Sequence, residues 1–192
     1  MKFLNGLMEW IWKLVYLNIV WILFSLPLIT LIPATFVMFS IVNKWLTEDQ
    51  DPNLFSTFIR EFKSYFWKSY PLGIVLIVLG AFLTADLLIL KDLHSTYWLT
   101  VRYALIVVMF FFLVTASYSI PIYIHYGLSW YKTLFVSFMI GLRQPLTTFL
   151  MLCGILLVVM LVLFATGIGI CVMGSLIALI TSKAAKIGIN KI

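Results

Sequence analysis

Four long stretches of this sequence contain no Asp, Glu, Lys or Arg, and they limit what the chain can fold into more than any other feature. They are Leu14–Asn43, Ser69–Ala85, Tyr103–Tyr131 and Gln144–Ser182, with 30, 17, 29 and 39 residues. A helix needs about 20 apolar residues to cross the hydrocarbon core of a bilayer. These stretches therefore supply about five or six membrane crossings.

The composition agrees with this interpretation. Hydrophobic residues make up 64% of the 192 residues and charged residues 10%, whereas soluble domains average about 45–50% and about 25%. The mean hydropathy is +1.12. These values exclude a water-soluble enzyme and predict an all-α, polytopic membrane protein that forms a single integral membrane domain over residues 1–192.

The first charge-free stretch is too long for one crossing. As a helix its 30 residues would extend about 45 Å, against a hydrocarbon core of about 30 Å. Pro27 and Pro33 supply a bend, in which Thr30 is a candidate N-cap and Pro33 suits the first position of a new helix. We expect a span over about 9–26 and a short second segment over about 33–47.

The last charge-free stretch divides in the same way, because Gly167 and Gly169 form its central breaker. Spans are then expected at about 145–166 and 169–183. Two more are expected at about 71–90 and 97–124, with Pro121 as a kink in the second. The sequence thus predicts six segments in three hairpins, over about 9–47, 71–124 and 145–183.

The segment at about 53–70 is amphipathic rather than uniformly apolar. Aromatic residues recur at steps of three and four, and Lys and Arg take the opposite face, a pattern typical of a helix in the membrane interface. A related pattern at about 129–143 predicts a second such helix. The aromatic face of the first includes Phe55, Phe58, Phe62 and Phe66.

The positive-inside rule places both termini in the cytoplasm. With six segments, 11 of the 13 Lys and Arg residues fall on the inner side, and Lys91 and Arg102 stay outside. If the first stretch crossed only once, the division would be 9 to 4. The same topology explains the net charge of +6, and no basic run suggests nucleic acid.

Few polar residues lie in the apolar segments. Asp86 and Arg102 are equidistant from the centre of the second hairpin, so we predict an ion pair between them, with a substrate or proton site at Asp86 as the alternative. Asn18 lies in mid-span, where its amide can join helices. Arg143 is expected to anchor a helix end by snorkelling, or to contact a lipid headgroup.

No catalytic arrangement is evident. The sequence has no HExxH, no CxxC, no paired carboxylates in its apolar segments and no P-loop. We therefore predict that the chain is not an enzyme, that no catalytic, metal or cofactor residues are present, and that it does not bind ATP directly.

The run from Asn18 to Lys44 is more specific. It contains Asn-x-x-Trp, then Ser-Leu-Pro, a Thr, and Pro-Ala, and it ends in Lys. In this the sequence resembles the YesL-like family of small bacterial membrane proteins, although Ile32 stands where members of that family usually have glycine. The matching residues are Asn18, Trp21, Ser25, Leu26, Pro27, Thr30, Pro33, Ala34 and Lys44.

The resemblance implies a place in the bacterial plasma membrane and a link with carbohydrate utilisation, because such proteins accompany sugar ABC importers. It brings no catalytic residues. We expect an accessory or regulatory subunit that contacts membrane lipid and the importer's permease subunits. The alternative is a small transporter or substrate-capture subunit with its own cavity.

Overall fold

The computed structural model describes residues 2–47, 53–92, 96–164 and 166–189. Over these ranges the elements are helices, and no strand occurs. Six of the helices are long and apolar enough to cross a membrane. This confirms the predicted all-α class with six membrane segments.

The first hairpin comprises α1 (Lys2–Ser25), a short 3-10 turn η1 (Leu28–Thr30) and α2 (Leu31–Thr47). The bend lies at Pro27 as predicted, but Pro33 is the third residue of α2 and not the first, so the expected start of that helix is wrong. The 3-10 turn leads directly into α2, and the apolar segment runs over Leu28–Thr47. Proline is tolerated there because the first four N–H groups of a helix have no intrahelical partner.

The middle of the chain forms α3 (Leu54–Tyr65), α4 (Tyr70–Ile89), a 3-10 turn η2 (Leu90–Asp92) and α5 (Thr96–Tyr126). The amphipathic helix α3 ends five residues before the predicted limit of 70. At 31 residues, α5 is about 46 Å long, more than a bilayer core requires.

The last part forms α6 (Trp130–Arg143), α7 (Pro145–Phe164) and α8 (Thr166–Ile189). The predicted break at Gly167 and Gly169 is misplaced, because α8 already begins at Thr166. This helix also continues beyond the predicted limit of 183 and carries Lys183 and Lys186 within it. The prediction ended the segment where the apolar run ends, at the first of these two lysines, and therefore made the helix too short.

Two apolar clusters hold the helices together. One joins α1, α2, α3 and α8, and the other joins α5, α6, α7 and α8. Thus α8 contributes to both, and its fully buried residues Ser175 and Ala178 are small. Small residues allow helix backbones to approach closely, which is how helices associate in lipid.

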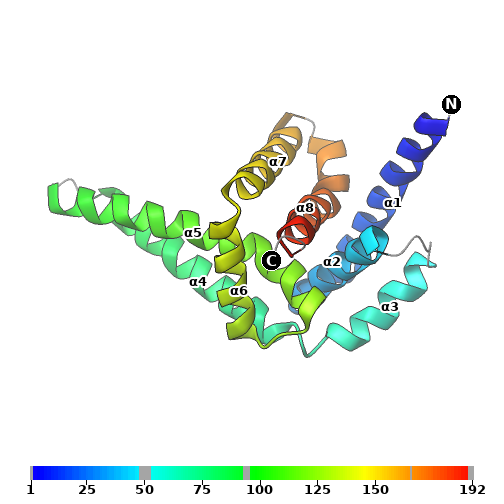
Figure 1. The fold of residues 1–192 in the computed structure, drawn as a ribbon, viewed down its shortest axis with the longest axis horizontal. Coiled ribbons are helices and arrows are strands. Elements are labelled where there is room, and N and C mark those ends of the chain that lie inside the picture. The colour runs from blue at the N-terminus through cyan, green and yellow to red at the C-terminus, as the bar shows by residue number, and fades with distance from the viewer. Residues whose placement is uncertain (1, 48–52, 93–95, 165, 190–192) are drawn as a thin grey trace.

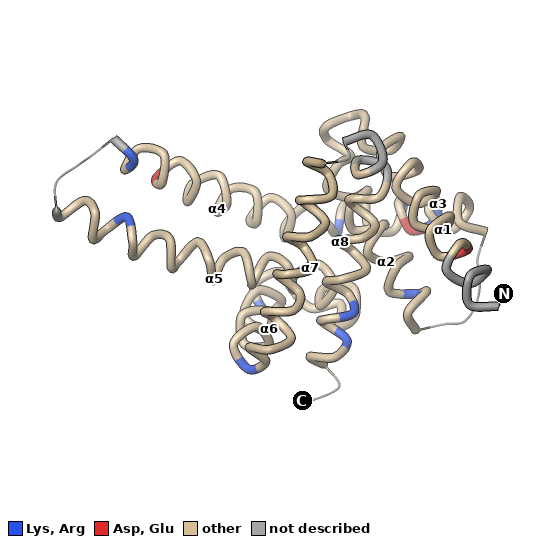
Figure 2. Tube along the Cα trace, turned by 90° about the horizontal axis from the view of Figure 1, so that it is seen from above, with Lys and Arg blue, Asp and Glu red and all other residues tan. Residues whose placement is uncertain are grey.

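Figures 1 and 2 show α4 and the first half of α5 side by side, projecting away from the other helices. We call α4 together with residues 96–112 the α4–α5 arm. Only 11% of the residues in the apolar window of α4 are buried inside the protein, compared with 50% for α2. Most of the arm's surface therefore contacts lipid or another chain.

Candidate functional site

The residues of the family pattern build the bend between α1 and α2. The Trp21 indole donates to the Thr35 hydroxyl at 3.2 Å, which joins the two helices. The Thr30 hydroxyl donates to the carbonyls of Phe24 and Pro27, each at 2.6 Å. Thr30 is therefore not an N-cap as predicted, because its side chain satisfies carbonyls of the preceding turn instead of amides of α2.

Asn18 is fully buried between helices. A Cβ added at Gly174 of α8 would lie 2.7 Å from the Asn18 Oδ1 atom and 3.3 Å from the Met38 methyl group. The side chain of Asn18 thus occupies space that only glycine leaves free. In the described structure Asn18 belongs to the contact of α1 with α2 and α8.

The aromatic face of α3 packs onto the protein itself. The ring of Phe24 in α1 lies 4.9 Å from Phe58, 5.3 Å from Phe62 and 6.4 Å from Phe55, measured between centroids. Phe66 continues this row with a centroid distance of 5.6 Å to Phe62. The aromatic face is therefore not free to enter the membrane as the interfacial pattern suggested, although Phe55 remains 47% exposed.

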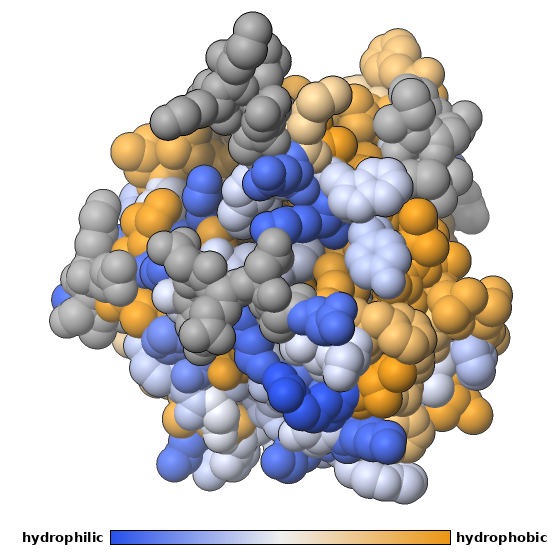
Figure 3. Space-filling view, turned by 90° about the vertical axis from the view of Figure 1, so that its right-hand side faces the viewer, coloured by the Kyte–Doolittle hydropathy of each residue, from blue (hydrophilic) through white to orange (hydrophobic). Residues whose placement is uncertain are grey.

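The opposite face of α3 is polar and exposed. Arg60 and Lys63 lie on it, and Lys68 follows in the turn before α4. Figure 3 shows hydrophilic residues gathered on the side of the molecule that carries α3. This surface is basic, since the carboxylate of Glu61 in the same helix points toward α2.

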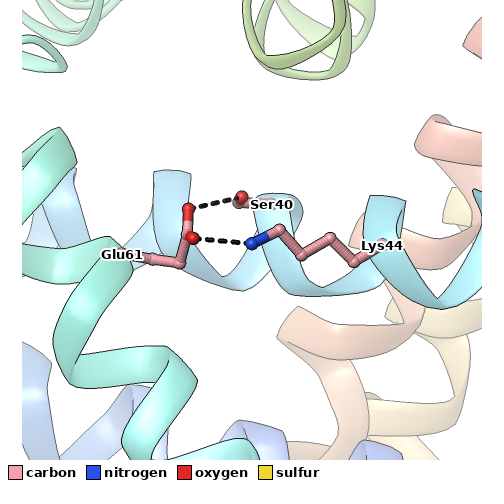
Figure 4. A network of polar contacts seen from close by, with 3 residues as sticks. All are labelled: Ser40, Lys44 and Glu61. Atoms are coloured by element: carbon pink, nitrogen blue, oxygen red, sulfur yellow. Dashed lines mark hydrogen bonds and ion pairs between the residues drawn. The ribbon is translucent and has the colours of Figure 1, made fainter. Parts of the chain in front are cut away.

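A polar cluster of Ser40, Lys44 and Glu61 connects α3 to α2 (Figure 4). The Lys44 ammonium lies 2.6 Å from Glu61 Oε1, and the Ser40 hydroxyl donates to Glu61 Oε2 at 3.1 Å. The two charged side chains are 30% and 15% exposed. Both carboxylate oxygens thus have partners, and the cluster fixes the position of α3.

Tyr65 borders this cluster. Burial raises the pKa of its hydroxyl, a hydrogen bond with Ser40 opposes that rise, and the charges of Glu61 and Tyr123 add to it. The hydroxyl therefore remains neutral at physiological pH. Tyr65 therefore places no second negative charge beside Glu61.

The sequence interpretation gave Glu61 no role, although a signal was present. Glu61 follows Phe58 by three residues and precedes Tyr65 by four, so it lies on the aromatic face of the helix. A carboxylate on such a face requires a partner. Lys44, which the family pattern identified, is that partner.

Replacing Glu61 by alanine is expected to lower the free energy of unfolding by about 1–3 kcal/mol, because Lys44 loses its ion pair and Ser40 its acceptor. Thermal unfolding in detergent would measure this change. Arg60→Ala is the matched control, since this neighbour is exposed and should change stability by less than about 0.5 kcal/mol. Equal effects of the two substitutions would show that the cluster does not hold α3.

The predicted ion pair between Asp86 and Arg102 is wrong. Both side chains are half-buried, and among the described residues neither forms an ion pair. A symmetrical hairpin centred on residue 94 would place Gly80 opposite residue 108, but Gly80 faces the ring of Phe112, farther along α5. The two helices therefore do not have the register that the prediction assumed.

Arg143 is the last residue of α6 and is exposed. No group of three or more His, Cys, Asp or Glu residues within the described ranges could hold a metal ion. Among the described residues, the polar side chains discussed above form an ion pair and hydrogen bonds between helices. Six apolar helices and an external amphipathic helix define a multi-pass, all-α membrane protein.

Comparison with known proteins identifies its family. Residues 14–87 match the family described as "Protein of unknown function, DUF624". The chain is 34% identical over 183 residues to the "Uncharacterized protein YesL" of Bacillus subtilis (strain 168). The aligned residues cover 94% of this chain and 86% of that protein. This chain therefore belongs to the YesL-like family, as its sequence pattern indicated.

Two further relatives from the same organism support the assignment. The "Uncharacterized protein YesV" is 31% identical over 147 residues, 74% of this chain and 70% of that protein. The "Uncharacterized protein YteU" is 30% identical over 133 residues, 68% of this chain and 59% of that protein. No solved structure matches the chain.

Proposed function

We propose that this protein is a non-enzymatic accessory or regulatory membrane subunit of a bacterial carbohydrate ABC importer. In this proposal the α4–α5 arm packs against the permease subunits within the plasma membrane. The importer is suggested by the resemblance to the YesL-like family. The requirement for a protein partner is supported by the structure of the arm.

The observation that carries the proposal is that Asp86 and Arg102 have no ion-pair partner within the described structure. Both lie within membrane-spanning helices of the arm, and neither has an ion-pair partner among the described residues. Ionisable groups at such positions usually face a protein interior or a cavity and are paired. The little-buried surface of α4 and these two charges together favour a second chain beside the arm.

The basic face of α3 gives secondary support. Arg60, Lys63 and Lys68 lie next to an apolar span, as expected of a cytoplasmic segment under the positive-inside rule. In the proposal both chain termini lie on that side, and α3 is presented at the cytoplasmic surface. The Lys44–Glu61 ion pair would then hold the helix in place beside the importer.

The alternative of a small sugar transporter receives less support. A hollow of about 280 Å³ lies between α5, α6 and α7, and its described lining is apolar except for Thr148. The Thr148 hydroxyl donates to the Gly141 carbonyl at 3.0 Å and lies 3.2 Å from the Tyr118 hydroxyl. A sugar would find few hydrogen-bonding groups in this hollow.

Asp86→Asn and Arg102→Gln are expected to reduce retention of the permease subunits severalfold, because each removes one charge that the proposal pairs with the partner. The measurement is affinity purification from membranes in mild detergent, with the permeases quantified per copy of this chain. Lys91→Gln is the matched control, since Lys91 is exposed in η2 at the end of the arm. It should leave retention unchanged.

Two results would contradict the proposal. In one, the wild-type chain is purified alone while the permeases are recovered intact without it. In the other, Asp86→Asn abolishes sugar uptake although the purified assembly is unchanged, which would favour transport through this chain itself.

A further inference from the structure

The exposed surface of α6 has the character of a lipid-facing surface. Phe135 and Met139 are 65% and 52% exposed, whereas Thr133 and Ser137 are fully buried against the protein. A helix in water shows the opposite distribution, with its apolar residues inside. The outer side of α6 is therefore suited to contact with acyl chains.

Three hollows meet where α6 joins α7. A headgroup hollow of about 310 Å³ is lined by Arg143, Gln144, Pro145, Leu146 and Thr147. It shares Pro145 with the apolar hollow between α5, α6 and α7, and shares Arg143 with an apolar groove of about 560 Å³ along α6. Leu142 lines both apolar spaces. One polar space is thus flanked by two apolar ones.

The depth of this junction suits a headgroup. The Gln144 side-chain amide donates to the Gly188 carbonyl at 3.0 Å, which ties the junction to the C-terminal end of α8. That end of α8 also carries Lys183 and Lys186. Lys and Arg near the ends of spans lie at the level of the polar headgroups, so Arg143 and the two lysines mark the same interface.

The charge at the junction is positive. Arg143 is exposed between the headgroup hollow and the groove, and no carboxylate is among the described residues that line the three spaces. Guanidinium groups bind phosphate oxygens through paired hydrogen bonds. A diester phosphate would meet a cation here without facing an opposing negative group.

We propose that this junction binds one anionic, two-chain phospholipid. Its phosphate contacts Arg143, one acyl chain enters the hollow between α5, α6 and α7, and the other lies along the groove of α6. Phe110 and Phe111, which belong to the inner end of the α4–α5 arm, line one of the hollows. The site does not depend on the importer proposal, because that proposal rests on Asp86 and Arg102 and the lipid site uses neither. It assigns a specific ligand to a surface that would otherwise hold exchanging bulk lipid.

Native mass spectrometry of the purified chain tests this site with phosphatidylglycerol and with phosphatidylcholine of the same acyl chains. We expect the wild type to retain one phosphatidylglycerol with about fivefold preference, the ratio that one basic residue provides at an anionic surface. Arg143→Gln should reduce the ratio to about one. Arg143→Lys, which keeps the charge, should retain most of it.

Lys132→Gln is the matched control, because Lys132 is an exposed cation near the other end of the same helix. It should leave the preference unchanged. The proposal is overturned if Arg143→Gln keeps the preference, or if Lys132→Gln loses it equally, as a general attraction between charges would require. Displacement of the lipid by glycerol phosphate at equal concentration would indicate a site for free phosphate and would also overturn it.

Discussion

A Phe58→Ala variant is expected to lose about 3–5 kcal/mol of stability and to release α3 from the rest of the protein. Phe58 is 0% exposed, and its ring lies against Phe24 of α1 and Phe62 of its own helix. Alanine would leave a cavity at the centre of this contact. The loss corresponds to a melting temperature lower by roughly 10 °C.

Limited trypsin digestion in detergent would detect the release directly, because α3 contains the cleavage sites Arg60 and Lys63. Cleavage at these residues should be much faster in Phe58→Ala than in the wild type. Phe55→Ala is the control, since its ring is 47% exposed and lies farther from Phe24. It should cost less than about 1 kcal/mol, and a result equal to that of Phe58→Ala would contradict this account of the α3 contact.

The membrane segments could be predicted because each is determined by the residues of its own stretch of sequence. A run without charged residues identifies a span whatever its neighbours are, and Pro27 marks a bend through its own backbone geometry. The aromatic period of α3 is equally local. Helix ends were predicted less well, as at Pro33 and Gly167, because a 3-10 turn or an early helix start depends on few hydrogen bonds.

The contacts between segments could not be predicted in the same way. The distance between Asp86 and Arg102 depends on the register of α4 against α5, which is set by packing of Gly80 on Phe112 and by the turn η2. Counting outward from the centre of the loop assumes two regular helices. A register other than the symmetrical one was enough to separate the two charges.

The Ser40–Lys44–Glu61 cluster could be predicted in part. Lys44 was identified through the family pattern, and Glu61 could have been identified as the one carboxylate on an aromatic helix face. Ser40 could not, because its role depends on how α2 lies against α3. The proposed lipid site is of the same kind, since the hollow between α5, α6 and α7 exists only where three helices meet.

Gly73→Val is expected to lower the free energy of unfolding by about 2–3 kcal/mol, near the upper end of the cost of overpacking. Gly73 in α4 lies against the side chain of Ile32 in α2, with no room for a Cβ between them. Ile32 is also the position at which the resemblance described above leads us to expect glycine. We infer that the large side chain at residue 32 and the small one at residue 73 form a matched pair in this chain.

A double-mutant cycle tests that pairing. Ile32→Ala alone removes a half-buried side chain and should also destabilise, but in Gly73→Val it relieves the overlap, so the double variant should be more stable than Gly73→Val. Thermal unfolding in detergent would give a coupling energy of about 1 kcal/mol or more. Gly80→Ala on the same helix is the control and should cost less, because an added Cβ would lie 3.3 Å from the edge of the Phe112 ring, which then needs to move by only a few tenths of an ångström. Strict additivity of the two substitutions would mean that Ile32 and Gly73 fit their helices independently, and that the departure from the family pattern is not compensated at α4.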